Sequence, residues 1–118
     1  MNVQRGDVVL INYPYAGGLG AKVRPALVIQ NDRDNQRLVN TIVAQITSVT
    51  HRSGEPTQLL VEVATPDGQR SGLHWDSVVN CANLFTVEKG KVIRKIGELS
   101  TAQMHQVDDC LKSALGLP

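Results

Sequence analysis

Short runs of apolar, β-branched residues recur along most of this chain, and each run is bounded by glycine, proline or polar residues. Runs of this kind favour strands, because β-branched side chains pack well on a pleated sheet. The expected strands are residues 7–13, 24–31, 40–47, 58–64, 69–75, 76–80 and 84–87. Many short strands joined by turns predict a mainly β fold, either a small antiparallel barrel or a strongly curled sheet.

The segments between these runs carry turn and loop signals. Residues 14–22 contain three glycines and a proline and are expected to form a loop, and the charged residues 32–36 are expected to form a turn. Proline followed by Asp-Gly at 65–68, between two strand patterns, predicts a β-hairpin. Pro25 is expected at the start of its strand, where it removes no ladder donor. Residues 89–99 fit either a helical turn or a strand.

The last part of the chain carries the clearest helix pattern. Ser100 and Gln103 have the spacing of a capping box. Apolar residues follow at helical spacing, namely Met104, Val107, Leu111, Ala114 and Leu115. Gly116 then supplies the left-handed residue at which helices commonly end. We therefore expect a C-terminal α-helix that packs on the sheet, within one domain spanning residues 1–118.

The charge balance limits how this chain can bind nucleic acid. Its net charge of +1 at pH 7 excludes a protein that holds nucleic acid mainly through bulk positive charge. One tryptophan, one phenylalanine and two tyrosines are too few for a broad base-stacking platform. Any nucleic-acid chemistry must therefore come from a small local site.

The cysteines and histidines do not have the spacing of metal ligands. We expect Cys81 and Cys110 to be buried thiols, with a disulfide as the alternative, and we expect no metal and no cofactor. The chain starts without a signal-peptide pattern, and no stretch approaches the roughly 18 apolar residues that a membrane-spanning helix needs. These features predict a cytoplasmic protein with no membrane association.

Two short segments carry side chains suited to binding a phosphate. Arg24 follows the glycine-rich segment, and its guanidinium offers a planar fork of donors to two phosphate oxygens. Thr47 and Ser48 stand at the end of an expected strand, where neighbouring hydroxyls can hydrogen-bond a phosphoryl oxygen. The alternatives are a structural salt bridge for the arginine and a cap of the following turn for the hydroxyls.

A third segment combines an imidazole, an indole and a carboxylate in His74-Trp75-Asp76. Strand alternation would place His74 and Asp76 on one face and Trp75 on the other. A histidine and a carboxylate on one face can support acid–base chemistry. The alternative is a core tryptophan flanked by polar surface residues.

These segments belong to a longer series of motifs that runs through nearly the whole chain. The motifs are Arg5-Gly6-Asp7-Val8, Arg24-Pro25-Ala26-Leu27-Val28-Ile29, Ile46-Thr47-Ser48, Gly72-Leu73-His74-Trp75-Asp76 and Ile96-Gly97-Glu98-Leu99-Ser100. In this combination the chain resembles the MazF/PemK family of toxin endoribonucleases, or mRNA interferases, from bacterial type II toxin–antitoxin modules.

The resemblance implies an SH3-like or CcdB-like antiparallel barrel with a C-terminal helix, assembled as a homodimer. It implies metal-independent, sequence-specific cleavage of single-stranded RNA, in which the 2′-hydroxyl attacks the neighbouring phosphate. It also implies a cognate antitoxin protein whose disordered tail wraps the toxin and blocks the RNA site.

The resemblance also assigns residues. Arg24 matches the family's catalytic arginine and Thr47 its catalytic threonine, and Asp76 or His74 is expected to supply a general acid or base. The expected RNA-binding residues are Tyr15, Gly17, Gly20, Lys22 and Ser48.

The glycine-rich loop departs from the family pattern, because residues 16–21 lack the Ser-Glu-Gln found in many members. A non-catalytic SH3-like binding module is therefore kept as an alternative function. A gyrase poison of the CcdB type is the other alternative, although such proteins depend on a tryptophan near the C-terminus. This chain ends in Gly116-Leu117-Pro118.

Overall fold

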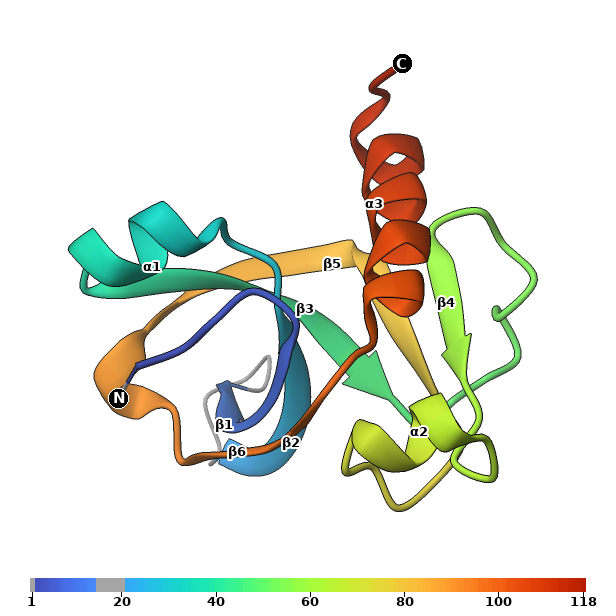
Figure 1. Ribbon diagram of the computed structural model, residues 1–118, viewed down its shortest axis with the longest axis horizontal. Helices are drawn as coiled ribbons and strands as arrows, with labels where there is room; N and C mark the ends of the chain where they lie inside the picture. The colour runs from blue at the N-terminus through green and yellow to red at the C-terminus, as the bar shows by residue number, and fades with distance from the viewer. Residues whose placement is uncertain (1, 15–20) are drawn as a thin grey trace.

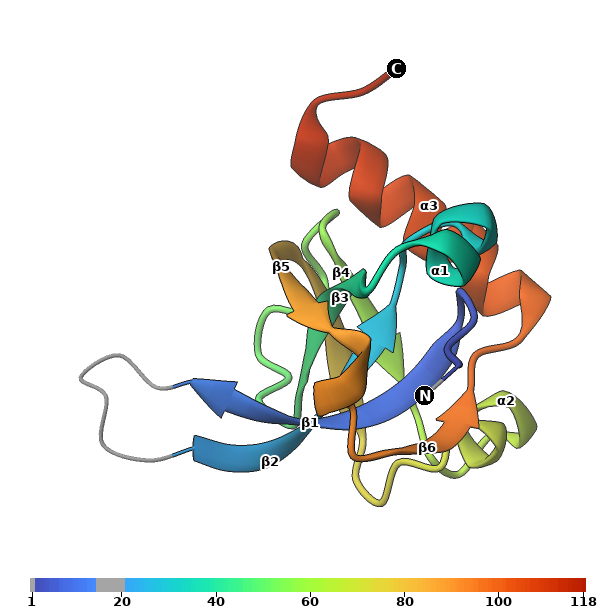
Figure 2. The same ribbon diagram turned by 90° about the vertical axis from the view of Figure 1, so that its left-hand side faces the viewer.

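The structure is a computed structural model that describes residues 2–14 and 21–118. Within these residues the strands form a six-stranded antiparallel sheet in the order β4-β5-β3-β2-β1-β6. The strands are β1 (Asp7–Pro14), β2 (Ala21–Val28), β3 (Asn40–Thr47), β4 (Gln58–Val61), β5 (Ser77–Glu88) and β6 (Arg94–Glu98). The helices are α1 (Asp32–Arg37), α2 (Pro66–Arg70), the 3-10 turn η1 (Lys89–Lys91) and α3 (Thr101–Leu115). The sheet curls round, with α3 beside β4 and β5 (Figure 1), and β1 and β2 extend together away from the other strands (Figure 2).

The expected fold class, a mainly β antiparallel sheet with a C-terminal helix, is confirmed. α3 begins at the predicted capping box, in which the Ser100 hydroxyl accepts from the Gln103 N–H and the Gln103 side chain accepts from the Ser100 N–H. It ends at Gly116, which adopts a left-handed φ of 69°. Leu115, the last residue of the predicted apolar stripe, is exposed. Among the residues described, no helix is long and apolar enough to cross a membrane.

Both faces of the curled sheet are buried. One face packs against α3, and its core includes Val8 and Leu27. The other face closes on itself around a second core that includes Val9 and Val28. Successive residues of a strand point to opposite faces. Two buried faces therefore explain why the strand sequences are continuously apolar rather than alternating.

Residues 65–68 begin a helix, so the predicted hairpin turn is wrong. The Thr65 hydroxyl caps α2 by accepting from the Gly68 N–H at 3.0 Å, and Pro66 lies in the first helical turn. A capping hydroxyl followed by proline is itself a helix-start signal, which competes with the turn signal of Pro-Asp-Gly. The strand predicted at 69–75 is also wrong, because these residues form the end of α2 and an irregular turn.

The two strands predicted at 76–80 and 84–87 are one strand, β5, with an irregularity between them. Its pairing with β3 jumps from Ala44–Leu84 to Gln45–Asn80. Extra residues on one strand of a pair bend that strand and increase its twist. The irregularity therefore contributes to the curl of the sheet.

Pro25 lies within β2 rather than at its start. At Pro25, β2 pairs with β1 alone, because its pairing with β3 covers only Ala26–Val28. Proline is tolerated where a strand has a single neighbour. Residues 89–99 contain both of the expected alternatives in succession, first η1 and then β6.

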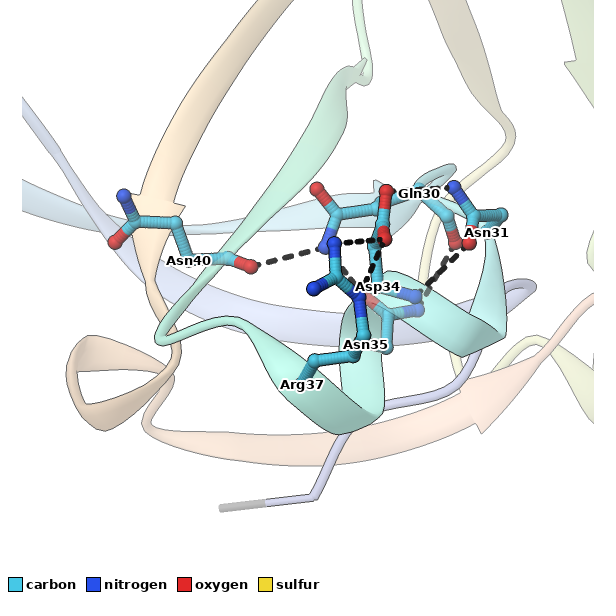
Figure 3. Close-up of polar contacts among 6 residues, drawn as sticks. All are labelled: Gln30, Asn31, Asp34, Asn35, Arg37 and Asn40. Atoms are coloured by element: carbon cyan, nitrogen blue, oxygen red, sulfur yellow. Dashed lines mark hydrogen bonds and ion pairs between the residues drawn. The ribbon is translucent and has the colours of Figure 1, made fainter.

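The segment predicted as a turn at 32–36 is helix α1. The Asn31 side chain caps it by accepting from the Asp34 N–H at 2.9 Å. The buried Asn35 ties α1 to the sheet through Gln30, whose Nε2 donates to Asn35 Oδ1 at 3.0 Å and to the Asn40 carbonyl at 2.9 Å (Figure 3). Local capping and a buried amide network thus stabilise a helix too short to persist alone.

Cys81 and Cys110 are free, buried thiols, as expected. Both belong to the core between α3 and the sheet. Burial, together with the neighbouring Cys110, raises the pKa of Cys81 to about 12. The thiolate forms are therefore strongly disfavoured in the folded protein.

Candidate active site

β2 and β3 separate from each other beyond the Ala26–Gln45 pair. If the register continued by two residues, Arg24 would lie directly opposite Thr47 on the same face of the sheet. The strands instead diverge, and a cleft of about 560 Å³ opens where they part. The register therefore brings the two residues to the same cleft from two different strands.

The cleft is built from five parts of the chain. β1, β2 and the end of β3 form much of its lining, and Ile96 of β6 and the turn before β5 complete it. This turn, residues 72–76, follows α2 (Figure 1). The lining includes Arg24, Thr47, Ser48 and His74 of the predicted site residues.

Arg24 is exposed at the cleft. Its Nη1 donates to the Val23 carbonyl at 3.2 Å. No salt bridge of Arg24 occurs in the part of the chain that the structure describes. The guanidinium thus retains most of its donors for a ligand.

Thr47 is half-buried at the end of β3. Its hydroxyl oxygen accepts from the Val49 N–H at 3.1 Å, so it does cap the following turn. A hydroxyl can accept one hydrogen bond and still donate its own hydrogen. Capping therefore fixes the position of Thr47 while leaving it a donor for a phosphoryl oxygen.

The structure separates His74 from Asp76. The two do not share a strand face, since residues 72–76 form a turn, and that prediction is wrong. His74 is exposed and lines the cleft, whereas Asp76 is not among the lining residues. One carboxylate oxygen of Asp76 instead accepts from the Val63 N–H at 2.9 Å, beyond the end of β4. Trp75, for which a core position was the alternative, is exposed and lines the cleft.

Of the expected RNA-binding residues, Ser48 lines the cleft and Lys22 is exposed on β2 outside the lining. Tyr15, Gly17 and Gly20 lie outside the described residues. Tyr13 packs edge-on against Phe85, with ring centroids 4.9 Å apart, and burial raises its pKa. Its hydroxyl is buried and has no hydrogen-bond partner in residues 2–14 and 21–118.

Sequence reasoning missed Gln45, which also lines the cleft. Its Oε1 accepts from Asn80 Nδ2 at 3.3 Å and from Asn83 Nδ2 at 3.1 Å. These two bonds orient the Gln45 amide and join the cleft to the irregular part of β5. The available signal was a single amide inside the otherwise apolar residues 42–46 of β3.

The turn that carries His74 and Trp75 is held at both ends. Gly72 has a φ of 73°, and a Cβ there would clash with the Ile96 carbonyl. After the turn, the Ser77 hydroxyl donates to the Trp75 carbonyl at 2.7 Å, next to the Asp76 contact with the end of β4. Packing and hydrogen bonds thus fix the backbone that presents the two side chains to the cleft.

Comparison with known proteins identifies the family. Residues 4–115 match the model of a family described as PemK-like, MazF-like toxin of type II toxin-antitoxin system. The chain belongs to this family. Endoribonuclease EndoA of Bacillus subtilis (strain 168) is 37% identical to it over 118 residues, covering 99% of this chain and 97% of the relative.

Solved structures agree with this membership of the PemK/MazF family. An endoribonuclease in complex with its cognate antitoxin, from a mycobacterial species, is 28% identical and superposes with a TM-score of 0.76, covering 98% of this chain and 97% of the other. The Mycobacterium tuberculosis toxin MazF-mt6 is 25% identical and has a TM-score of 0.77, covering 95% of this chain and 98% of that toxin. The six-stranded curled sheet with its C-terminal helix is thus the MazF-type fold.

Proposed function

We propose that this PemK/MazF-family chain is the toxin of a type II toxin–antitoxin module and cleaves single-stranded RNA at short specific sequences. One observation carries the proposal: Arg24 of β2 and Thr47 of β3 line the same cleft. The activity named for EndoA supports the reaction class.

The reaction is an in-line attack of a ribose 2′-hydroxyl on the adjacent phosphorus. The bond from phosphorus to the 5′ oxygen breaks, which leaves a 2′,3′-cyclic phosphate and a 5′-hydroxyl. The nucleophile belongs to the RNA, so no metal is needed to generate it, and DNA is excluded because it lacks this group.

Arg24 and Thr47 stabilise the charge that develops on the phosphorane. Arg24 binds two phosphoryl oxygens through its fork of donors, and Thr47 donates its hydroxyl hydrogen to one of them. A guanidinium stays protonated in proteins, so Arg24 clamps the phosphate and does not act as a base.

His74 is the residue assigned to proton transfer. Its imidazole lines the cleft, where it can take the proton of the attacking 2′-hydroxyl and return a proton to the leaving 5′ oxygen. Asp76 has a positioning role in this scheme, because its carboxylate binds the Val63 N–H and steadies the turn that carries His74.

The remaining RNA contacts are assigned to residues around the cleft. Ser48 is adjacent to Thr47 and lines the cleft, and Lys22 precedes Arg24 by two residues on β2. Tyr15, Gly17 and Gly20 keep the RNA-binding role that the family resemblance assigns to them.

The assembly follows the family. The chain is one domain over residues 1–118, acts in the cytoplasm as a homodimer, and is neutralised by a small antitoxin protein. A related endoribonuclease is described in complex with its cognate antitoxin, which supports this partner. Light scattering that shows a monomer at micromolar concentration would contradict the homodimer.

The test is cleavage of a long single-stranded RNA in EDTA. Wild-type protein gives discrete cuts with cyclic phosphate ends, and Arg24→Ala lowers the rate by at least about a hundredfold. Arg37→Ala is the matched control, because this exposed arginine pairs with Asp34 on α1, away from the cleft. Cleavage that requires magnesium contradicts the mechanism, and RNA binding without cleavage indicates a non-catalytic binding module instead.

A further inference from the structure

Trp75 is the single tryptophan of the chain, and 73% of its surface is exposed. Large aromatic side chains are usually mostly buried, so an exposed indole on a fixed turn is informative. It lines the same cleft as Arg24 and Thr47.

We propose that Trp75 is a base-stacking residue of this cleft, and that its indole packs against the base of a nucleotide next to the phosphate held by Arg24 and Thr47. This inference rests on the proposed function and adds a residue that contacts a base of the RNA.

The side chains that line the cleft suit both the phosphate and the base of a nucleotide. Arg24 offers donors to the phosphate, while Trp75, Leu73 and Ile96 contribute apolar side chains to the lining. A volume of about 560 Å³ lies within the range of about 300 to 1,000 Å³ usual for small ligands. An indole stacks on any base, since every base has a π face.

The turn that carries Trp75 is fixed by contacts within the protein itself. The clash that a Cβ at Gly72 would make with the Ile96 carbonyl shows how closely the turn packs on β6. Asp76 anchors the turn to the Val63 N–H, just beyond the end of β4. Preorganisation reduces the entropy cost of binding, so more of the stacking energy contributes to affinity.

Among the described residues, Tyr13 also lines the cleft, but its ring packs edge-on against Phe85. Both rings are at least half-buried against the second core, whereas Trp75 is exposed. An exposed tryptophan also suits a protein interface. RNA is favoured here because Trp75 shares its cleft with the phosphate-binding residues.

The first measurement compares cleavage kinetics after the cut sites of wild-type protein have been mapped in a random-sequence RNA pool. Trp75→Ala raises KM about tenfold with kcat nearly unchanged, because stacking acts on the ground state and the transition state alike. Trp75→Phe restores most of the affinity. Val39→Ala is the control, since Val39 is 76% exposed and does not line the cleft.

The second measurement uses the fluorescence of the single tryptophan. An oligonucleotide with a mapped cut sequence and a 2′-O-methyl group at the cut ribose binds without being cleaved. It quenches wild-type fluorescence in a saturable way, and the midpoint of this titration agrees with the KM of the unmodified oligonucleotide.

The outcomes separate the two proposals. Absence of cleavage by wild-type protein overturns the proposed function, and the stacking role falls with it. If wild-type protein cleaves RNA normally, two results overturn the stacking role alone. One is an unchanged KM for Trp75→Ala, and the other is no change in wild-type fluorescence when the oligonucleotide binds. Loss of antitoxin binding or of the dimer in Trp75→Ala, with RNA kinetics unchanged, assigns Trp75 to a protein interface instead.

Discussion

Thr47 shows how one hydroxyl can have a structural and a chemical role at once. Its oxygen accepts from the Val49 N–H, which fixes the side chain at the end of β3, and its hydrogen remains available to a ligand. Arg24 reaches the same cleft from β2 without a salt bridge among the described residues. Neither side chain therefore has to break a strong contact before it binds a phosphate.

We predict that Thr47→Val lowers kcat for RNA cleavage by about a hundredfold, because it keeps the side-chain shape and removes both the donor to the phosphate and the acceptor that caps the Val49 N–H. Thr47→Ser retains activity within about tenfold of wild type. Rates are measured in EDTA at saturating RNA, with Thr86→Val as the control because Thr86 is exposed on β5 outside the cleft. Equal rates for Thr47→Val and wild type would contradict the role of the hydroxyl.

At the scale of elements, the cleft depends on how closely the end of α2 and the turn that follows it pack on β6. A Cβ at Gly97 would clash with the Ser71 backbone, and a Cβ at Gly72 would clash with the Ile96 carbonyl. The turn therefore lies directly against the backbone of β6. The Ser100 hydroxyl adds a link between helices, because it caps α3 and donates to Asp67 Oδ2 of α2 at 2.9 Å.

We predict that Gly72→Ala destabilises the protein by about 1–3 kcal/mol, because it combines a left-handed φ with a steric clash. It also displaces His74, so the cleavage rate falls even at temperatures where the variant is fully folded. Urea denaturation and cleavage rates are measured together. Gly54→Ala is the matched control, since a Cβ at Gly54 meets no atom within 4 Å. Wild-type rates in folded Gly72→Ala would show that the position of the turn is unimportant.

At the scale of the whole molecule, stability comes from two cores, one on each face of the curled sheet. Cys81 is fully buried in the core beneath α3, where the charged thiolate is poorly solvated. Its pKa is about 12 in the folded protein, above the value of about 8.5 for an unfolded cysteine. Folding therefore favours the neutral thiol.

We predict that this difference makes the protein less stable in alkali. The contribution of the Cys81 thiol to the free energy of unfolding is complete below about pH 8.5 and is lost as the pH rises towards about 12. The reason is that the thiol loses its proton at a lower pH in the unfolded chain than in the folded protein. The free energy of unfolding is measured in urea at pH 8 and pH 10. Wild type loses more stability over this interval than Cys81→Ala, and parallel losses would show that Cys81 does not couple to pH.

Much of this protein is determined by its sequence. The β-branched runs specify the strands of an antiparallel sheet, and the Ser100–Gln103 box and Gly116 specify both ends of α3. These signals act through backbone angles and hydrogen bonds within a few residues, which local sequence contains. The motifs with Arg24 and Thr47 also identified the family before their geometry was known.

Only the tertiary structure decided the course of the chain between β4 and β5. The segment Thr65-Pro66-Asp67-Gly68 suits both a hairpin turn and the start of a helix. In the structure it begins α2, and Gly68 lies directly against the backbone of Glu62. The turn that follows places Trp75 at the cleft and directs Asp76 to Val63. These positions depend on contacts with β6 and with the end of β4. Such contacts join residues far apart in sequence, and no local pattern specifies them.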